Sequence, residues 1–173
     1  QELAVLWKNP DLASRAKKLQ AEIQRGIGEH AIVKHQTFGK IYAYEVDGLG
    51  NSLLMDDANV PSLLALPYLE YPYLDAEIYA NTRRFLLSAS NPSFKQGTNE
   101  WTGPVAGIGS PHMQARIRNN IWPMGLAIEA LTEESRTRAT IITEQLVNAT
   151  AGTGWMHESF DAGNPKKFTR SWF

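Results

Sequence analysis

The N-terminal part of the chain repeats apolar side chains every three to four positions, which is the period of an amphipathic helix. Asn9 and Pro10 interrupt the repeat. Both residue types are typical of a helix start, with the asparagine as N-cap and the proline in the first turn. The pattern therefore predicts two helices within residues 1–26, with Gly26 and Gly28 closing the second.

The period changes near residue 41. Residues 41–46 are rich in β-forming side chains, residues 47–51 have the composition of a turn, and residues 52–55 can return as a second strand. This pattern predicts a small β-hairpin at about 41–55, outside the core of the fold.

Helical patterns return further along the chain. Cap residues precede apolar stripes at 57–66 and at 75–87, and further helices are expected at 117–131 and from Thr132 to about Val147. These patterns add four helices to the two at the N-terminus.

Two intervening segments, 88–115 and 148–167, concentrate glycine, proline and polar residues. They are predicted as long loops, a kind of segment that is often functional. A further helix could open at Phe168.

Helix pairs would thus be joined by alternating short and long connections, with no βαβ rhythm and no heptad repeat. We expect a single all-α domain over residues 1–173, built from helical hairpins that stack side by side and gather their long loops at one end. A chain of 173 residues is long enough for one domain and short for two.

Composition and charge narrow the function classes. The chain has 17 basic and 18 acidic residues and a net charge of −1, so we expect no nucleic-acid partner. Its apolar runs are too short for a membrane span. Cysteine is absent and the four histidines lack the spacing of metal ligands, so no metal or other cofactor is expected.

Both ends carry side chains that are usual inside a protein. Residue 1 already lies within the first amphipathic pattern, and the chain ends on the aromatic pair Trp172 and Phe173. We expect the chain to be a piece of a longer one, and a processed terminus is the alternative.

Candidate chemistry concentrates in the loops. Asp56, Asp57 and Asn59 stand at the start of the helix predicted at 57–66, where they would cap its first amide groups. Two adjacent aspartates exceed what one cap needs, so the second could instead bind paired hydroxyl groups of a ligand. His112 follows a glycine-rich stretch that would let the backbone approach a ligand, although an ordinary loop explains it as well.

Glu158 is the most prominent carboxylate of the last loop. It lies between Trp155 and Phe160, whose rings could stack on a sugar and would shield Glu158 from water. A buried glutamate that ties a loop down is an equally open interpretation. Arg170 belongs by its spacing to a solvated basic face, but it could orient a carboxylate.

Six segments occur in a recognisable order along the chain: EVDGLGN (45–51), MDDANVPSLL (55–64), NTRRFLLS (81–88), GIGSPH (107–112), IWPM (121–124) and MHESF (156–160). Together they resemble glycoside hydrolase family 125, whose members are metal-independent exo-α-1,6-mannosidases. The resemblance covers nearly the whole chain from about residue 40.

This resemblance implies an (α/α)₆ barrel and an inverting mechanism. In that mechanism a carboxylic acid protonates the leaving oxygen and a carboxylate activates water on the opposite face, with the two groups roughly 6.5–9.5 Å apart. Glu158, in the His-Glu-Ser-Phe motif, takes the role of the base. By the same resemblance the terminal mannose site is lined by Asp56, Asp57, Asn59, His112, Trp122 and His157. The implied partner is an α-1,6-linked mannose oligosaccharide or an N-glycan-derived mannan.

One departure from the family pattern concerns the general acid, an aspartate expected upstream of the first helix, for which residues 1–40 hold no matching segment. The chain would then hold the base and part of the sugar site, without the first hairpins and the closing helix of the barrel. An inverting glycosidase on the same barrel with another sugar specificity stays open, as does a non-catalytic carbohydrate-binding protein. The glycosylation triplet at 148–150 leaves both a secreted and a cytoplasmic location open.

Overall fold

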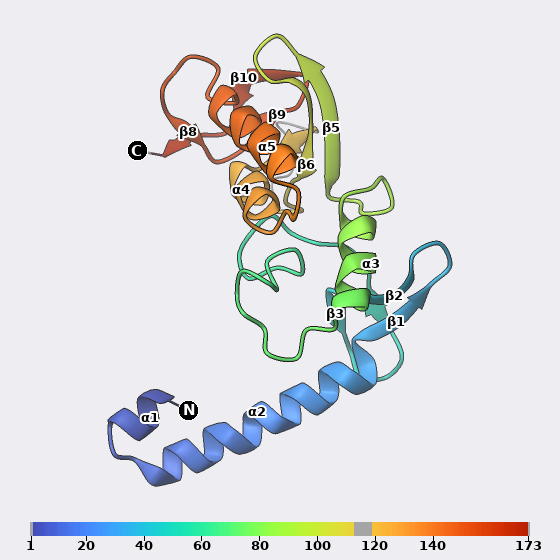
Figure 1. Cartoon of the computed structure of the whole chain (residues 1–173), viewed down its shortest axis with the longest axis vertical. Coiled ribbons are helices and arrows are strands. Elements are labelled where there is room, and N and C mark those ends of the chain that lie inside the picture. The colour runs from blue at the N-terminus through green and yellow to red at the C-terminus, as the bar shows by residue number, and fades with distance from the viewer. Residues whose placement is uncertain (1, 113–118, 173) are drawn as a thin grey trace.

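The computed structural model describes residues 2–112 and 119–172. Over these residues the chain forms five helices and eleven strands, and the strands pair in five small sheets (Figure 1). The expectation of an all-α fold built as an (α/α)₆ barrel is therefore wrong, because the structure is mixed α/β. The strands are only two to six residues long, which is too short for most of them to show the alternation that marks a strand.

Two helices form an N-terminal arm, α1 (Glu2–Leu6) and α2 (Pro10–His30). The Asn9 side chain accepts a hydrogen bond from the Leu12 backbone N–H at 3.0 Å, so the predicted N-cap is confirmed. The helix runs through both glycines that were expected to close it, since a glycine inside a helix costs about 1 kcal/mol without breaking it. None of the residues of α2 is buried, and the helix projects from the body of the molecule (Figure 1).

Two small hairpins follow the arm. β1 (Ile32–His35) pairs with β2 (Gly39–Tyr42), and β3 (Glu45–Val46) pairs with β4 (Ser52–Leu53). The predicted hairpin is confirmed around its turn, where the Asp47 carboxylate accepts the backbone N–H groups of Leu49 and Asn51. Its first residues, 41 and 42, belong instead to the β1–β2 hairpin.

Residues 54–75 form turns and loop in place of the helix predicted at 57–66. The Asp56 carboxylate accepts the backbone N–H groups of Leu63 and Leu64 at 3.0 and 2.9 Å. These two N–H groups therefore bond to a side chain and not to the carbonyl groups of a helical turn. Aspartate side chains commonly compete with helical hydrogen bonds in this way.

The helix α3 (Ala76–Leu86) forms where its pattern predicts. Asp75 caps it by accepting a hydrogen bond from the Ile78 backbone N–H at 2.9 Å. Its buried face joins the first hydrophobic core, which consists of Ile41, Ala58, Leu64, Ala65, Phe85, Leu86, Ile108, Trp122 and Ile128.

β5 (Phe94–Asn99) and β6 (Gly103–Ile108) form a hairpin inside the segment 88–115 that composition predicts as a loop. Two of its glycines make room for neighbours. A Cβ atom on Gly97 would lie 2.7 Å from the Ala162 backbone, and one on Gly107 would lie 2.9 Å from the Leu126 side chain. The loop prediction is therefore wrong for the two strands, where these glycines serve packing, and confirmed for the turns and bends at residues 88–93. Residues 113–115 lie outside the described residues.

β7 (Asn120–Ile121) leads into a helical hairpin of α4 (Pro123–Leu131) and α5 (Arg136–Asn148). The helix predicted at 117–131 thus begins at Pro123, and residues 117 and 118 lie outside the described residues. Ser135 rather than Thr132 caps α5, by accepting from the Arg138 backbone N–H. The second core comprises Val105, Ile121, Leu126, Ile142, Ala149, Phe160 and Ala162.

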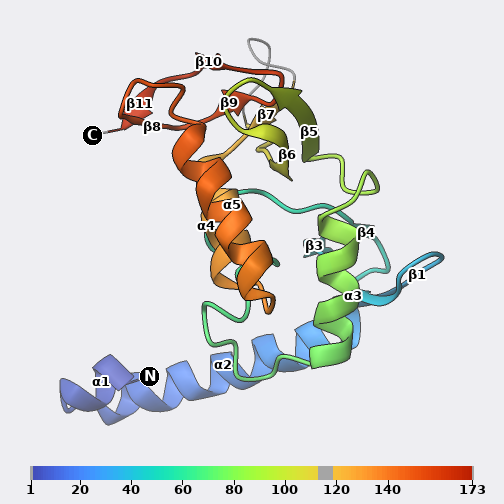
Figure 2. The same cartoon turned by 45° about the horizontal axis from the view of Figure 1, so that its top comes forward.

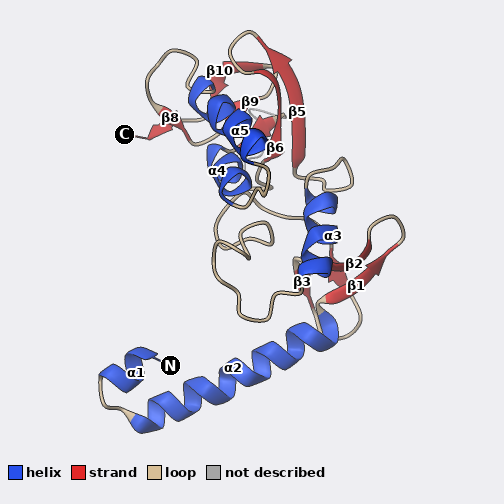
Figure 3. Ribbon diagram, viewed as in Figure 1, coloured by secondary structure: helices blue, strands red, loops and turns tan. Residues whose placement is uncertain are grey.

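The last segment holds four short strands: β8 (Met156–His157), β9 (Phe160–Asp161), β10 (Asn164–Phe168) and β11 (Ser171–Trp172). β9 lies between β10 and β7, and β11 pairs with β8. The prediction of a loop over 148–167 is confirmed for the turns at residues 149–155 and wrong where these strands form. The helix predicted from Phe168 is wrong, because Phe168 ends β10. Figures 2 and 3 show these strands gathered with β5 and β6 at one end of the α4–α5 hairpin, far from α2. No helix in the described ranges has the length and apolar character to cross a membrane.

Candidate active site

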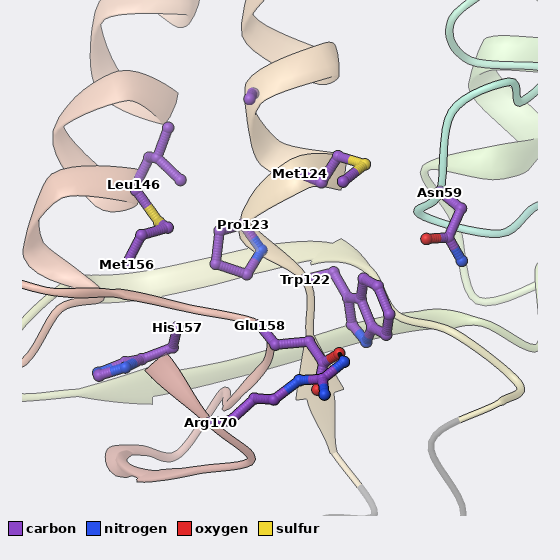
Figure 4. A pocket seen from close by; sticks show the side chains of 10 residues that line it. Asn59, Trp122, Pro123, Met124, Leu146, Met156, His157, Glu158 and Arg170 are labelled. Carbon is purple, nitrogen blue, oxygen red and sulfur yellow. Dashed lines mark hydrogen bonds and ion pairs between the residues drawn. The ribbon is translucent and has the colours of Figure 1, made fainter. Parts of the chain in front are cut away.

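A cavity of about 510 Å³ lies beside the start of α4, the end of α5 and β8 (Figure 4). One set of lining residues is apolar and comes from the two helices and β8: Pro123, Met124, Ala127, Leu146 and Met156. The other set carries polar atoms: Asn59, Trp122, His157, Glu158 and Arg170. The cavity therefore combines a hydrophobic wall with hydrogen-bonding groups, which is the usual character of a small-molecule site.

The pairing of β7 with β9 brings Trp122 and Glu158 together. Ile121 lies opposite Phe160 in this antiparallel pair, so the residue after Ile121 lies beside the residues that precede Phe160. The Trp122 backbone N–H also donates to the Ile108 carbonyl at 3.1 Å, which fixes this residue against β6. Figure 4 shows the side chains of Trp122, Glu158 and Arg170 close together at the cavity.

Both carboxylate oxygens of Glu158 are held by neighbours. Arg170 donates from Nη2 to Oε1 at 2.5 Å, and Thr169 donates from Oγ1 to Oε2 at 3.1 Å. The Glu158 side chain is 9% exposed against 62% for Arg170, so the carboxylate is largely withdrawn from water while its cation stays solvated. Glu158 thus ties down the segment at 169–170 and also lines the cavity, and the two interpretations of this residue are compatible.

His157 lines the cavity with both ring nitrogens engaged inside the protein. Nε2 lies 3.2 Å from the Thr150 carbonyl oxygen, to which it can only donate, so Nδ1 accepts from Ser171 Oγ at 3.0 Å. The ring stacks on Phe168 with centroids 3.8 Å apart. Burial lowers the pKa of His157 and so favours the neutral ring. The hydrogen bond to the Thr150 carbonyl has a smaller, opposite effect on this pKa. The role of His157 as a sugar ligand stays a prediction.

Asp56 is fully buried and is not among the residues that line the cavity. Burial raises its pKa from 3.8 to about 7; the backbone N–H groups of Leu64 and Leu63 oppose this rise, and the nearby charge of Asp57 adds to it. Its contacts shape the loop at 54–75 from inside. A sugar-binding role for Asp56 also stays a prediction.

Asp57, Asn59 and His112 form a polar group next to the cavity. Asp57 Oδ1 accepts from the side-chain amide of Asn59 at 3.0 Å, and Asp57 Oδ2 lies 3.4 Å from His112 Nε2. The Asp57 side chain is nearly buried while His112 is exposed. Asn59 lines the cavity and links this group to it, so the structure brings together three of the residues predicted to bind sugar.

Gly109 helps to position this polar group through a backbone hydrogen bond to Ala58, the residue between Asp57 and Asn59. Its carbonyl accepts from the Ala58 backbone N–H at 3.1 Å, and a Cβ atom at this position would lie 2.3 Å from the Asn120 carbonyl oxygen. We predict that Gly109→Ala lowers the free energy of unfolding by about 1–3 kcal/mol, because the loop must move to admit the methyl group. Chemical unfolding followed by tryptophan fluorescence measures this loss.

Gly26→Ala is the matched control, because the residue is inside α2 and its added Cβ would meet no described atom within 4 Å beyond the neighbouring backbone of the helix. It should leave stability unchanged or raise it by up to about 1 kcal/mol. Equal effects of the two substitutions would contradict the close approach at Gly109.

Sequence reasoning missed Thr169 and the apolar wall of the cavity. Thr169 stands in a polar run without a motif, and only its hydrogen bond to Glu158 marks it. Met124 and Leu146 lie on helices, where apolar side chains suggest core packing. Arg170 does pair with a carboxylate, as one interpretation of the sequence proposed.

The arrangement suits a reaction that needs a positioned base near a flat apolar surface. A carboxylate with one donor on each oxygen keeps further lone pairs for a water molecule. The Trp122 ring offers a flat face, and its Nε1 is buried without a hydrogen-bond partner among the described residues. Within the ranges that the structure describes, no three His, Asp or Glu side chains are grouped to hold a metal ion.

The sequence matches the family described as "Metal-independent alpha-mannosidase (GH125)" over residues 1–173. It is 47% identical over 164 residues to the "Meiotically up-regulated gene 157 protein" of Schizosaccharomyces pombe, covering 94% of this chain and 31% of that protein. A solved structure of a metal-independent α-mannosidase from Streptococcus pneumoniae, in a non-productive complex with α-1,6-mannobiose, is 44% identical with a TM-score of 0.87. That match covers 99% of this chain and 39% of the other. The chain thus spans about a third of the length of these relatives.

Proposed function

Because the chain belongs to glycoside hydrolase family 125, we propose that it is part of an α-mannosidase that releases terminal α-1,6-linked mannose with inversion of configuration. The substrate would be an α-1,6-linked mannose oligosaccharide or an N-glycan-derived mannan. The observation that carries the proposal is the Glu158 carboxylate, held by two donors at the edge of a cavity that Trp122 also lines. Support for the linkage comes from the 44% identical mannosidase, which is described in complex with α-1,6-mannobiose.

Glu158 is the general base in this proposal. It takes a proton from a water molecule, whose oxygen bonds to the anomeric carbon while the bond from that carbon to the leaving oxygen breaks. An acid on the opposite face of the sugar ring gives the leaving oxygen its proton. The buried position of Glu158 supports this role, because a base that is shielded from bulk water and fixed in rotation needs little reorganisation during the reaction.

The sugar site in this proposal has two sides. The ring of Trp122 packs against the apolar face of the mannose, and Asn59 with its partner Asp57 accepts and donates hydrogen bonds to the sugar hydroxyls. His112 would reach the same hydroxyls from the exposed side, next to Asp57. Asp56 and His157 would support the sugar site indirectly, by holding the surrounding backbone, since their polar atoms already bond within the protein.

The general acid in this proposal lies outside residues 1–173. The chain covers 31% and 39% of the two relatives, which leaves room for the acid elsewhere in a protein of their length. The proposed activity therefore belongs to the full-length protein, and residues 1–173 form one part of its catalytic domain.

Mannose release from α-1,6-mannobiose by the full-length protein, with and without a chelator, tests the proposed function. We expect release at the same rate in both conditions, because the family to which the chain belongs is described as metal-independent. The α-1,2- and α-1,3-linked mannobioses serve as matched substrates and should react much more slowly. Binding without release from any linkage would favour a carbohydrate-binding protein and would overturn the proposal.

A further inference from the structure

A buried chain of hydroxyl groups ends on Glu158. Ser159 Oγ lies 3.1 Å from Thr169 Oγ1, and Thr169 Oγ1 donates to Glu158 Oε2 at 3.1 Å. A threonine hydroxyl has one proton, and Thr169 gives it to the carboxylate, so Ser159 must be the donor in the first contact. Ser159 is 0% exposed and Thr169 is half-buried, so water does not compete freely for these groups.

Backbone pairing holds this chain in register. The Glu158 backbone N–H donates to the Arg170 carbonyl at 2.8 Å, and the Thr169 N–H donates to the Ser159 carbonyl at 3.2 Å. Just beyond them, His157 of β8 lies opposite Ser171 of β11. The hydroxyl of Thr169 is therefore placed by main-chain hydrogen bonds on both sides rather than by its own side-chain rotamer alone.

Arg170 alone would leave the Glu158 carboxylate free to turn. Its Nη2 donates to Oε1 from a side chain that is 62% exposed. A single donor permits rotation about the last bond of the glutamate side chain, whereas a second donor on Oε2 fixes the plane of the carboxylate. Threonine suits this task because its branched side chain has few rotamers and its donor sits one bond from Cβ.

We propose that Thr169, supported by Ser159, is a positioning residue that fixes the plane of the Glu158 carboxylate toward the water molecule it activates. This inference rests on the proposed function, since it assigns a task in the reaction that Glu158 would carry out. Ser159 occupies the acceptor site of Thr169 and so directs the threonine proton to Oε2. Thr169 is not among the residues that line the cavity, and its effect passes through Glu158 alone.

Thr169→Val in the full-length enzyme tests the inference, because it removes the hydroxyl and keeps the shape of the side chain. We expect kcat for α-1,6-mannobiose to fall about 10- to 100-fold, the size of effect that a misplaced reacting group produces, with KM nearly unchanged. Thr169→Ser keeps the donor and should restore most of kcat. Ser159→Ala should lower kcat in the same direction by a smaller factor.

Thr143→Val is the matched control, since this α5 hydroxyl is exposed and donates to the Ala139 carbonyl. It should leave kcat and KM unchanged. The urea midpoint of each variant shows whether a lower kcat comes from unfolding or from a misplaced Glu158 carboxylate. If Thr169→Val does not fold, Ser159→Ala decides, and a wild-type kcat in that variant overturns the inference.

The outcomes separate this inference from the proposed function. A wild-type kcat in Thr169→Val, or equal losses in the Val and Ser variants, overturns the positioning role of Thr169 while the mannosidase proposal stands. Activity retained in Glu158→Gln overturns this inference together with the role of Glu158 as the base. No mannose release by the wild-type enzyme overturns the mannosidase proposal as well.

Discussion

Glu158→Gln is expected to remove almost all mannose release from the full-length enzyme while leaving substrate binding nearly intact. Removing a general base costs about 10²- to 10⁴-fold in kcat. The amide has the same size and still offers an oxygen to Thr169, and the ion pair it gives up involves an exposed arginine, so little stability should be lost. Steady-state kinetics give kcat, and calorimetry with α-1,6-mannobiose gives the dissociation constant.

Glu144→Gln provides the matched control, because it makes the same change at an exposed position of α5. Its kinetics should equal those of the wild type. A Glu158→Gln rate within a few-fold of wild type would show that another group activates the water, and the role proposed for Glu158 would be wrong.

Asp56→Asn is expected to change how the stability of the protein depends on pH. The pKa of Asp56 is about 7 in the folded protein and 3.8 in an unfolded chain, because the buried carboxylate has lost its hydration. Between these values the unfolded chain gives up the proton that the folded protein keeps, so the wild type loses stability as pH rises. The loss amounts to about 4 kcal/mol and is complete above pH 7. Asparagine does not titrate, so the Asp56→Asn variant does not lose this stability as pH rises.

Urea unfolding of both proteins at several pH values from 4 to 8 measures the difference in unfolding free energy. The asparagine variant should be the less stable one at pH 4, because its amide nitrogen cannot accept from Leu63 or Leu64, and this disadvantage should shrink as pH rises. Titrations of groups that do not interact with Asp56 are common to both proteins and cancel.

Asp47→Asn controls for the loss of a carboxylate that accepts two backbone N–H groups. Asp47 is exposed, and its hydrogen bonds with the Asn51 side chain and the Leu49 backbone lower its pKa. Its contribution to stability is lost as pH falls, which is the opposite sign to Asp56. A constant difference between wild type and Asp56→Asn across this pH range would contradict the raised pKa.

Some elements were predictable because the hydrogen bonds and apolar patterns that form them lie within a few residues of each other. α3 begins at a cap from Asp75 to Ile78, and its buried stripe repeats every three to four residues, so both signals lie within one or two turns. The same holds for Asn9 and the start of α2, and for the turn at residues 47–51. In each case the stabilising contacts join residues at most four positions apart.

Apart from the hairpin around residues 47–51, the strands were not predicted, because the contacts that stabilise many of them join residues far apart in the sequence. Gly97 and Gly107 suggest a loop until Ala162 and Leu126 pack against them, and two-residue strands such as β8 exist only through their partner. Enough such strands form to turn an expected all-α fold into a mixed one. The two neighbouring aspartates were equally hard to tell apart from the sequence. Asp56 accepts hydrogen bonds from backbone N–H groups, whereas Asp57 contacts the side chains of Asn59 and His112.

By itself the sequence determined the family, the prominence of Glu158 and the helices with local caps. Its six segments belong to this family, and the His-Glu-Ser-Phe motif singled out the carboxylate. Only the tertiary structure decided which side chains meet Glu158. The register of Ile121 with Phe160 brings Trp122 to it, and the pairing beside β11 brings Thr169 and Arg170. Such contacts depend on strand register between distant segments, which no local pattern encodes.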